Sequence, residues 1–439
     1  MQVFFKHSII RLVAMSPLST EEAWKKIFSK YAVLEALEKE PHFTIASHQI
    51  NEFREARLMT KFDSRAQLPA IFKKNGLAIL PVTRGSYAIG RYKAYAELDY
   101  PASVPRKVSP PDCQSVDCIN LYSESAALSF AFNAGIIDEI METRNALFTV
   151  SGRMSSGCFA YTIDDLARPH AYSLSVNNAQ IEIDAGYESK EHFCIVEAKN
   201  VAPEDFLIRQ LYYPYRLWST KLAKPVQPVF LVFSNNMFTA FSYAFSGHTH
   251  YNALQLLKVQ RFVIADEEIA LAEVRYFLES FHDFREPEVQ FPQADSFERV
   301  VDLLGILAER PLSREEITER YAFDKRQTNY YSDAGRYLGL LEKEREGALI
   351  VYRLTPAGRT IMRKRPKDKT LGLIRAILSR NVFNEACKIT LSTGHPPSNE
   401  RLAAVFAQAG LAIPINATTM ARRSSTVRKW VDWILQQCV

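Results

Sequence analysis

Three ionisable residues in one short stretch of the sequence have a spacing that could support metal-assisted chemistry. Residues 180–200 read QIEIDAGYESKEHFCIVEAKN, with Asp184 directly after one apolar run and Glu197 and Lys199 at the end of the next. Successive side chains of a strand point to opposite faces, so Glu197 and Lys199 share a face. Gly186 and the polar residues after it suit a hairpin, which would bring Asp184 beside that pair.

Two carboxylates and an amine on one face could act together on a phosphodiester. Carboxylate oxygens suit Mg²⁺, which also keeps waters and substrate phosphate among its ligands. A bound metal lowers the pKa of a water molecule and neutralises charge on the phosphate. A lysine can orient the attacking water and stabilise the developing charge. We therefore expect Asp184 and Glu197 to bind Mg²⁺, with Mn²⁺ as an alternative metal, and Lys199 to assist the water.

A purely structural interpretation competes with this one. Glu197 and Lys199 could form an ordinary solvated strand face that is held by a cross-strand salt bridge. Glu182, two residues before Asp184, would share its side of a regular strand. It is either an additional acidic residue near the metal or a polar neighbour, and the sequence leaves both open.

The pattern resembles the motif of the PD-(D/E)XK nuclease superfamily. That motif places an acidic residue at a hairpin and Glu/Asp-x-Lys at the end of the next strand. The matching residues here are Asp184 and Glu197-Ala198-Lys199, although Ile183 stands where the motif often has proline. The resemblance covers about residues 125–250 and implies a mixed-sheet nuclease core.

Two further site residues follow from the resemblance alone. Many members carry an active-site glutamine on the helix after the motif, which corresponds to Gln210 in RQLYYPYR. In some members a glutamate from an upstream helix completes the metal site, and Glu139 and Glu142 are the candidates.

The elements around the motif alternate between helix and strand. The sequence predicts a helix over 123–142, paired hairpin strands over 145–156 and 157–164, and strands over 226–236 and 237–246. The segment 203–222 is amphipathic and partly helical, with Pro214 as a break or kink. Such alternation indicates an α/β layer with a mixed sheet.

The character of the chain changes at Ser296. Three predicted helices and two short strands around Gly347 have the pattern of a winged helix over 296–368, and 369–439 looks like a helix-turn-helix unit. From Ser296 onward, 24 Lys and Arg residues stand against 15 Asp and Glu residues, although the net charge of the whole chain is only +5. A basic part beside a slightly acidic remainder suggests that the C-terminal third faces nucleic acid.

Polar and basic side chains in two predicted helices could read DNA. Arg suits guanine, and Gln or Asn suits adenine, in the major groove. The alternative is a solvated helix face in a protein-binding winged helix. The candidate DNA-binding residues are Arg326, Gln327, Asn329, Tyr330, Arg336, Arg422, Arg423, Ser425 and Arg428.

Length and composition predict a multidomain α/β (α+β) protein. The chain has 439 residues, 47% of them hydrophobic, which is too long for one ordinary domain but rich enough to bury several cores. No stretch of about 18 apolar residues occurs, and the charged N-terminus does not resemble a signal peptide, so we expect a cytoplasmic protein without a membrane partner. The expected divisions are an α+β region over 1–120 that could contact DNA, a nuclease domain over 121–295, a winged helix over 296–368 and a helical domain over 369–439.

Together these features predict a type II restriction endonuclease that cleaves double-stranded DNA. Cleavage of a palindrome implies a homodimer, since a two-fold protein matches two-fold DNA. Such an enzyme works beside a cognate DNA methyltransferase. Three alternatives stay open: a nuclease that cuts only modified DNA, a structure-specific repair nuclease, and a winged-helix DNA-binding regulator without catalysis.

Overall fold

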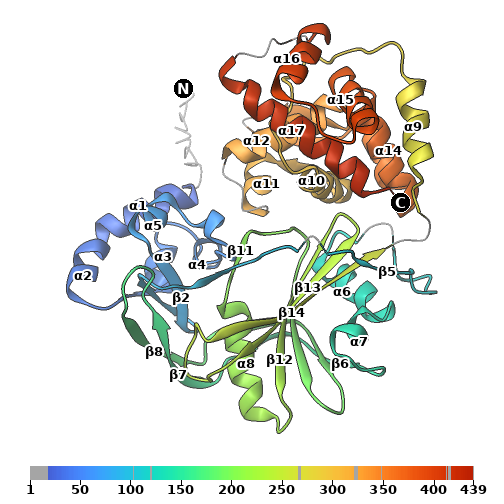
Figure 1. Cartoon of the computed structure of the whole chain (residues 1–439). Helices are drawn as coiled ribbons and strands as arrows, with labels where there is room; N and C mark the ends of the chain where they lie inside the picture. Colours follow the sequence, from blue (N-terminus) through green and yellow to red (C-terminus); the bar gives the residue numbers. More distant parts are fainter. Residues whose placement is uncertain are drawn as a thin grey trace, which may run out of the picture.

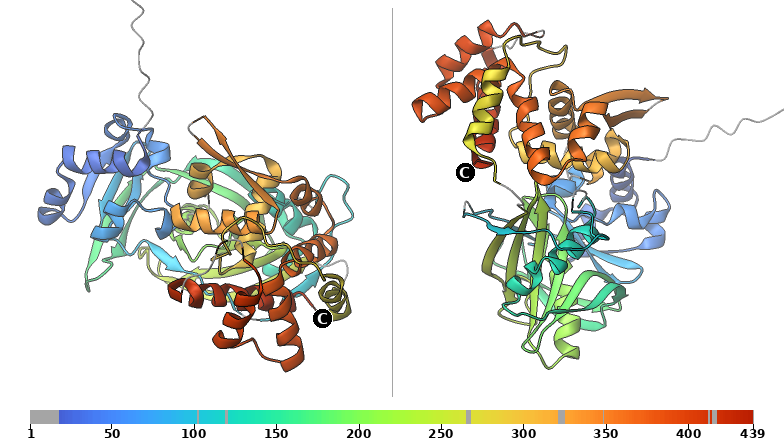
Figure 2. Two further views of the ribbon diagram at one scale, coloured as in Figure 1. Left: turned by 90° about the horizontal axis from the view of Figure 1, so that it is seen from above. Right: turned by 90° about the vertical axis from the view of Figure 1, so that its right-hand side faces the viewer.

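The computed structural model describes residues 18–101, 103–118, 121–264, 268–320, 325–347, 349–411, 413 and 417–438. These residues form a mixed α and β protein with several sheets. A central sheet has a smaller α/β part on one side, and a largely helical C-terminal unit lies over one end of it (Figures 1 and 2). Among the described helices, none has both the length and the apolar character that crossing a membrane requires.

The central sheet contains the motif strands and is mixed, as the sequence predicts. In spatial order its strands are β5 (Arg106–Val108), β14 (Leu254–Ile264), β13 (Met237–Phe245), β12 (Val226–Ser234), β10 (Phe193–Lys199), β9 (Gln180–Glu188) and β6 (Leu147–Ser155). Strand β10 runs antiparallel to β9 and parallel to β12. The crossover from β10 to β12 includes helix α8 (Arg209–Lys221), which contains Pro214.

Helices cover both faces of this sheet. Helices α6 (Glu124–Asn133) and α7 (Ile136–Ile140) pack against the face that carries Val196 and Ala198 of β10. On the opposite face, Ile195 packs with Trp218 of α8. The single helix expected over 123–142 is two helices, because Gly135 adopts a positive φ of 77° and redirects the chain.

A second sheet joins segments that are far apart in the sequence. Its strand order is β1 (Phe43–Ala46), β3 (Ser86–Gly90), β2 (Ala78–Thr83), β8 (Ala171–Asn177) and β7 (Cys158–Asp164). The helices beside it are α1 (Thr20–Lys30), α2 (Val33–Lys39), α3 (Ser47–Asn51), α4 (Ala56–Met59), the 3₁₀ helix η1 (Arg65–Gln67) and α5 (Ala70–Asn75). Two short strands, β4 (Tyr95–Glu97) and β11 (Asp205–Leu207), pair separately.

The predicted hairpin between 145–156 and 157–164 is wrong. Strand β6 pairs with β9, whereas β7 pairs with β8 in the second sheet. Gly157, with a φ of 68°, makes the turn between β6 and β7 at which the chain leaves the central sheet. The second sheet therefore draws strands from both sides of the boundary expected at residue 120.

The C-terminal unit is built around one hydrophobic core. Its elements are α9 (Leu271–Ser280), α10 (Phe297–Glu309), β15 (Leu312–Ser313), α11 (Arg314–Arg320), α12 (Lys325–Tyr337), β16 (Leu341–Glu346), β17 (Leu349–Leu354), α13 (Pro356–Met362), α14 (Pro366–Leu378), α15 (Asn381–Thr393), α16 (Asn399–Gln408) and α17 (Ala417–Gln436). The core runs from Phe297 through Phe383 to Trp430, so no gap separates the two domains expected on either side of residue 368. Strands β15, β17 and β16 form a small sheet whose β16–β17 hairpin projects from the unit (Figure 2).

Candidate functional site

The hairpin of β9 and β10 brings Asp184 next to the Glu-Ala-Lys segment. The paired register of the two strands ends at Val196 and Ala185, so Asp184 and Glu197 are the next residues on either strand. The backbone N–H of Ala198 donates a hydrogen bond to Asp184 Oδ2 at 2.8 Å. This bond fixes the Asp184 carboxylate at the C-terminal end of β10.

Strand β9 is irregular at Asp184. Its pairing with β6 shifts register between Val150 and Gly152, opposite this part of β9. Ile183 packs on the α8 face of the sheet, whereas Ala185 packs on the α6 face. Residues two apart share a face in a regular strand, so the strand is bulged here. A bulge changes the direction in which a side chain points, and the residue at this bulge is Asp184, the acidic residue of the motif.

Glu197 is buried beneath the site and accepts two hydrogen bonds on one oxygen. Only 7% of the residue is exposed. Lys199 Nζ donates to Glu197 Oε1 at 2.5 Å, and Gln210 Nε2 of α8 donates to the same oxygen. Because Glu197 is buried, this pair is not the solvated strand face of the structural interpretation. Gln210 therefore links helix α8 to the Glu-Ala-Lys segment of β10.

The third carboxylate of the site is Glu124. It occupies the first turn of α6, where Ser123 caps the helix, and its Oε1 lies 3.7 Å from Lys199 Nζ. The expectation of Glu139 or Glu142 is wrong: these residues pair with Arg106 and Lys258. Gly135 ends the first helix and leads the chain away before either is reached.

Burial of several carboxylates around one lysine shifts their titration. Burial raises the pKa of Glu197 to about 8 and raises the pKa of half-buried Asp184 above its usual value. Partial loss of solvent also raises the pKa of Glu124, although 46% of its side chain is exposed. Burial opposes protonation of Lys199, but the surrounding carboxylates, Glu197 first, raise its pKa overall. The site thus holds more acidic groups than the single positive charge of Lys199 can neutralise.

A loop of the N-terminal part also reaches the site, and no motif or local pattern of the sequence predicts this. The carbonyl of Asp63 accepts a hydrogen bond from Leu207 N–H at 2.8 Å, and Arg65 N–H donates to Asp205 Oδ1 at 2.8 Å. These bonds hold the loop against β11, just before α8. The positive charge of exposed Lys61 partly opposes the rise that burial causes in the pKa of Asp184 and Glu124, and the Asp63 carboxylate helps to raise the pKa of Lys199.

Glu182 lies at the margin of the site. It is exposed, and its carboxylate lies 3.4 Å from Arg153 Nε of the neighbouring strand β6. Its negative charge contributes to the raised pKa of Asp184. The structure therefore places it as a polar neighbour that is paired with a cation.

The candidate DNA-binding residues of α12 differ in exposure. Arg326 and Tyr330 are exposed, and Gln327, Asn329 and Arg336 are half-buried. Thr328 and Ser332 of the same helix are buried in the C-terminal unit.

The candidates of α17 divide into exposed and structural residues. The expectation that Arg423 contacts DNA is wrong, because it is 2% exposed and its guanidinium donates to the carbonyl of Phe291. Arg428 is half-buried and donates to the carbonyl of Pro397 at 2.9 Å. Arg422 is exposed and Ser425 is half-buried.

The chemistry of the site fits a hard divalent cation. Asp184 and Glu197 would offer it carboxylate oxygens, and Gln210 Oε1 is buried without a hydrogen-bond partner. Lys199 Nζ forms an ion pair with Glu197 and lies close to the Glu124 carboxylate. Within the described ranges, no three His, Cys, Asp or Glu side chains are gathered closely enough to hold a metal ion.

Three consecutive segments of the chain match families that are each described as a domain of unknown function. They are DUF6996 over residues 21–89, DUF6997 over 90–263 and DUF7226 over 299–439. Comparison with curated proteins and with solved structures gave no match. The residues from Glu124 to Gln210 fall in the DUF6997 segment, and Lys61 and Asp63 fall in the DUF6996 segment.

Proposed function

We propose that this protein is a Mg²⁺-dependent, site-specific endonuclease that hydrolyses phosphodiester bonds of double-stranded DNA, of the type II restriction class. The observation that carries the proposal is the convergence of Asp184, Glu197, Lys199 and Gln210 from β9, β10 and α8. A mixed sheet with helices on both faces supports a PD-(D/E)XK nuclease core.

Each side chain has a distinct task in the proposed reaction. Asp184 and Glu197 would hold Mg²⁺, and Glu124 is placed to assist them. When bound, Mg²⁺ lowers the pKa of water and offsets charge on the scissile phosphate. Lys199 orients the attacking water and stabilises the negative charge that develops on phosphorus oxygens. Gln210 fixes the rotamer of Glu197 through its amide hydrogen bond.

The C-terminal unit supplies DNA recognition in this proposal. The order α10, β15, α11, α12, β16, β17 and the three-stranded sheet support a winged helix, in which α12 would read the major groove. Exposed Arg326 and Tyr330 are the residues of α12 that we expect to contact the DNA first. The proposal includes a homodimer on palindromic DNA and a partner methyltransferase that protects the host site.

Digestion of plasmids tests the proposal. Purified protein is incubated with Mg²⁺ and several plasmids, each prepared with and without DNA methylation, and the fragment ends are sequenced. We expect one short sequence at every end and cleavage that methylation blocks. Cutting restricted to methylated DNA would favour the modification-dependent class, and preference for branched DNA a repair nuclease. Sequence-specific binding without cleavage on any background would favour the non-catalytic regulator.

A further inference from the structure

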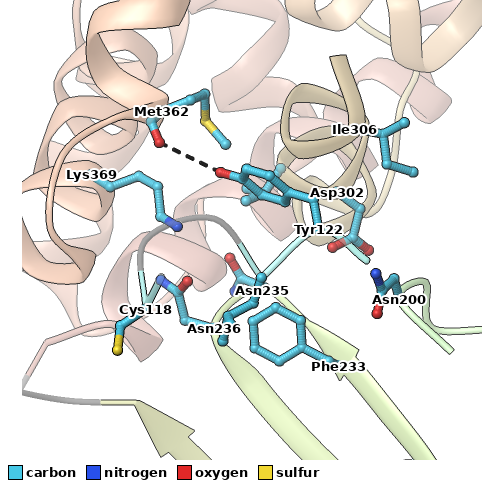
Figure 3. A pocket seen from close by; sticks show the side chains of 12 residues that line it. Cys118, Tyr122, Asn200, Phe233, Asn235, Asn236, Asp302, Ile306, Met362 and Lys369 are labelled. Carbon is cyan, nitrogen blue, oxygen red and sulfur yellow. Dashed lines mark hydrogen bonds between the residues drawn. The ribbon is translucent and has the colours of Figure 1, made fainter. Parts of the chain in front are cut away.

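The C-terminal unit contacts both chain segments that lead into the site. Tyr122 precedes Glu124 by two residues, and Asn200 directly follows Lys199. Both line a cavity of about 20 Å³ between the central sheet and the C-terminal unit, together with Met362 of α13 (Figure 3).

Tyr122 is fitted against a glycine of α10. A Cβ atom added to Gly305 would lie 2.5 Å from a ring carbon of Tyr122, which is closer than real contacts allow. The Tyr122 hydroxyl donates to the carbonyl of Met362 at 3.5 Å, and Lys369 Nζ lies 6.0 Å from the ring centroid. Figure 3 shows the ring reaching from the central part toward Met362, past the helix that carries Asp302 and Ile306.

Other contacts bind the same helix to the segments around the site. Asp302 of α10 accepts a hydrogen bond from Ser234 Oγ, at the end of β12, at 2.8 Å. The Arg299 guanidinium of α10 lies 3.2 Å from the Glu204 carboxylate. Val201 packs against the hydrophobic core of the C-terminal unit. Asn200 Oδ1 is buried at this junction without a hydrogen-bond partner.

We propose that Tyr122, seated against Gly305, is a positioning residue through which α10 holds Glu124 and Lys199 in their working places. This inference rests on the proposed nuclease function. Helix α10 also packs against α12, the candidate reader helix. Helix α10 therefore connects the helix that would contact DNA with the segments that carry the catalytic carboxylates. Displacement of a catalytic group by about 1 Å can lower a rate by about 10²-fold.

The substitution Gly305→Ala tests this fit without weakening the helix. Alanine has a higher helix propensity than glycine by about 1 kcal/mol, so α10 itself gains stability while its new methyl group displaces the Tyr122 ring. We expect kcat for plasmid cleavage at saturating DNA to fall about 10-fold or more, with DNA affinity within about 2-fold of wild type. The matched control is Gly372→Ala in α14, whose Cβ would meet Ile361 of the same unit at 3.1 Å. It should retain the wild-type kcat.

A second pair of variants keeps the test independent of folding defects. Tyr122→Ala should lower kcat on its own, because it empties the contact with Gly305. The double variant Gly305→Ala with Tyr122→Leu should recover activity relative to Gly305→Ala, since the smaller side chain leaves room for the methyl group. Wild-type kcat in both Gly305→Ala and Tyr122→Ala would overturn the inference while leaving the nuclease function intact. An inactive wild-type protein would overturn both.

Discussion

The cluster of Glu124, Asp184 and Glu197 around Lys199 is costly for a folded protein. Burying an ionised group is unfavourable unless it is paired, and Glu197 is buried beside Lys199 with half-buried Asp184 and exposed Glu124 nearby. The proposed phosphodiester cleavage would give such a group a use that stability of the fold does not. Perturbed titration of clustered acids is common where catalysis requires it.

Lys61 offers a test of the wider site. The Lys61→Ala variant should cleave DNA about 10-fold more slowly, because the lysine lies where it could offset phosphate charge next to Asp184 and Glu124. Lys61 is exposed, so its loss should change the free energy of unfolding by less than about 0.5 kcal/mol. Cleavage rates and thermal melts of Lys61→Ala and of the control Lys74→Ala, another exposed lysine of the same part, check this. Equal rates in the two variants would remove Lys61 from the site.

The motif strands are the elements that the sequence describes best. Alternation in residues 180–184 and the apolar run before Glu197 predict β9 and β10, and their hairpin follows from the polar segment between them. The bulge at Asp184 could not be predicted, because it depends on how β6 pairs with β9 across the insertion of β7 and β8. The same long-range pairing explains why the hairpin expected for β6 and β7 does not form.

Gly186 tests the packing that supports the hairpin. A Cβ atom at this position would lie 2.8 Å from the Phe193 ring and 3.1 Å from Val150. We expect Gly186→Ala to destabilise the protein by about 1–3 kcal/mol, as overpacking of a tight core does. Thermal denaturation beside the control Gly247→Ala, where a Cβ would meet no atom within 4 Å, measures the effect. Identical melting of the two variants would show that β9 and β10 can separate freely at this point.

At the level of the whole chain, the site is assembled from parts that sequence order keeps far apart. Asp63 contacts β11, which lies far from it in the sequence, so no local sequence pattern predicts the contact. Tyr122 contacts Gly305, which belongs to the C-terminal unit. The helices and strands of the C-terminal third are largely readable from helical spacing and turn residues. The sequence does not predict that these elements share a single core, because burial of Arg423 and the packing of Trp430 against Phe297 depend on tertiary contacts.

The junction of the two units should respond to pH through Asp302. Burial raises the pKa of this carboxyl from its usual 3.8 to about 7, with Ser234, the Asn235 backbone, Glu298 and Arg299 as its polar and charged neighbours. The folded state therefore keeps a proton that the unfolded state releases, so the stabilisation present below pH 3.8 is lost as the pH rises through 7. The free energy of unfolding should fall by at most about 4 kcal/mol through this titration.

The comparison with Asp302→Asn isolates this titration. The amide stays neutral, so the melting temperature of wild type should fall relative to that of Asp302→Asn as the pH rises from 4 to 8. Scanning fluorimetry across this range measures the difference. A constant difference would mean that Asp302 is ionised in the folded protein throughout.

The central claim is most directly tested by the rate at which Lys199→Ala cleaves plasmid DNA in Mg²⁺. Lys199 Nζ donates a hydrogen bond to Glu197, and its loss should lower cleavage by about 10²–10⁴-fold while DNA affinity stays unchanged. Lys190→Ala, which removes an exposed lysine from the same hairpin, should cleave like wild type. Cleavage by Lys199→Ala at the wild-type rate would contradict the assignment of this cluster as the catalytic site.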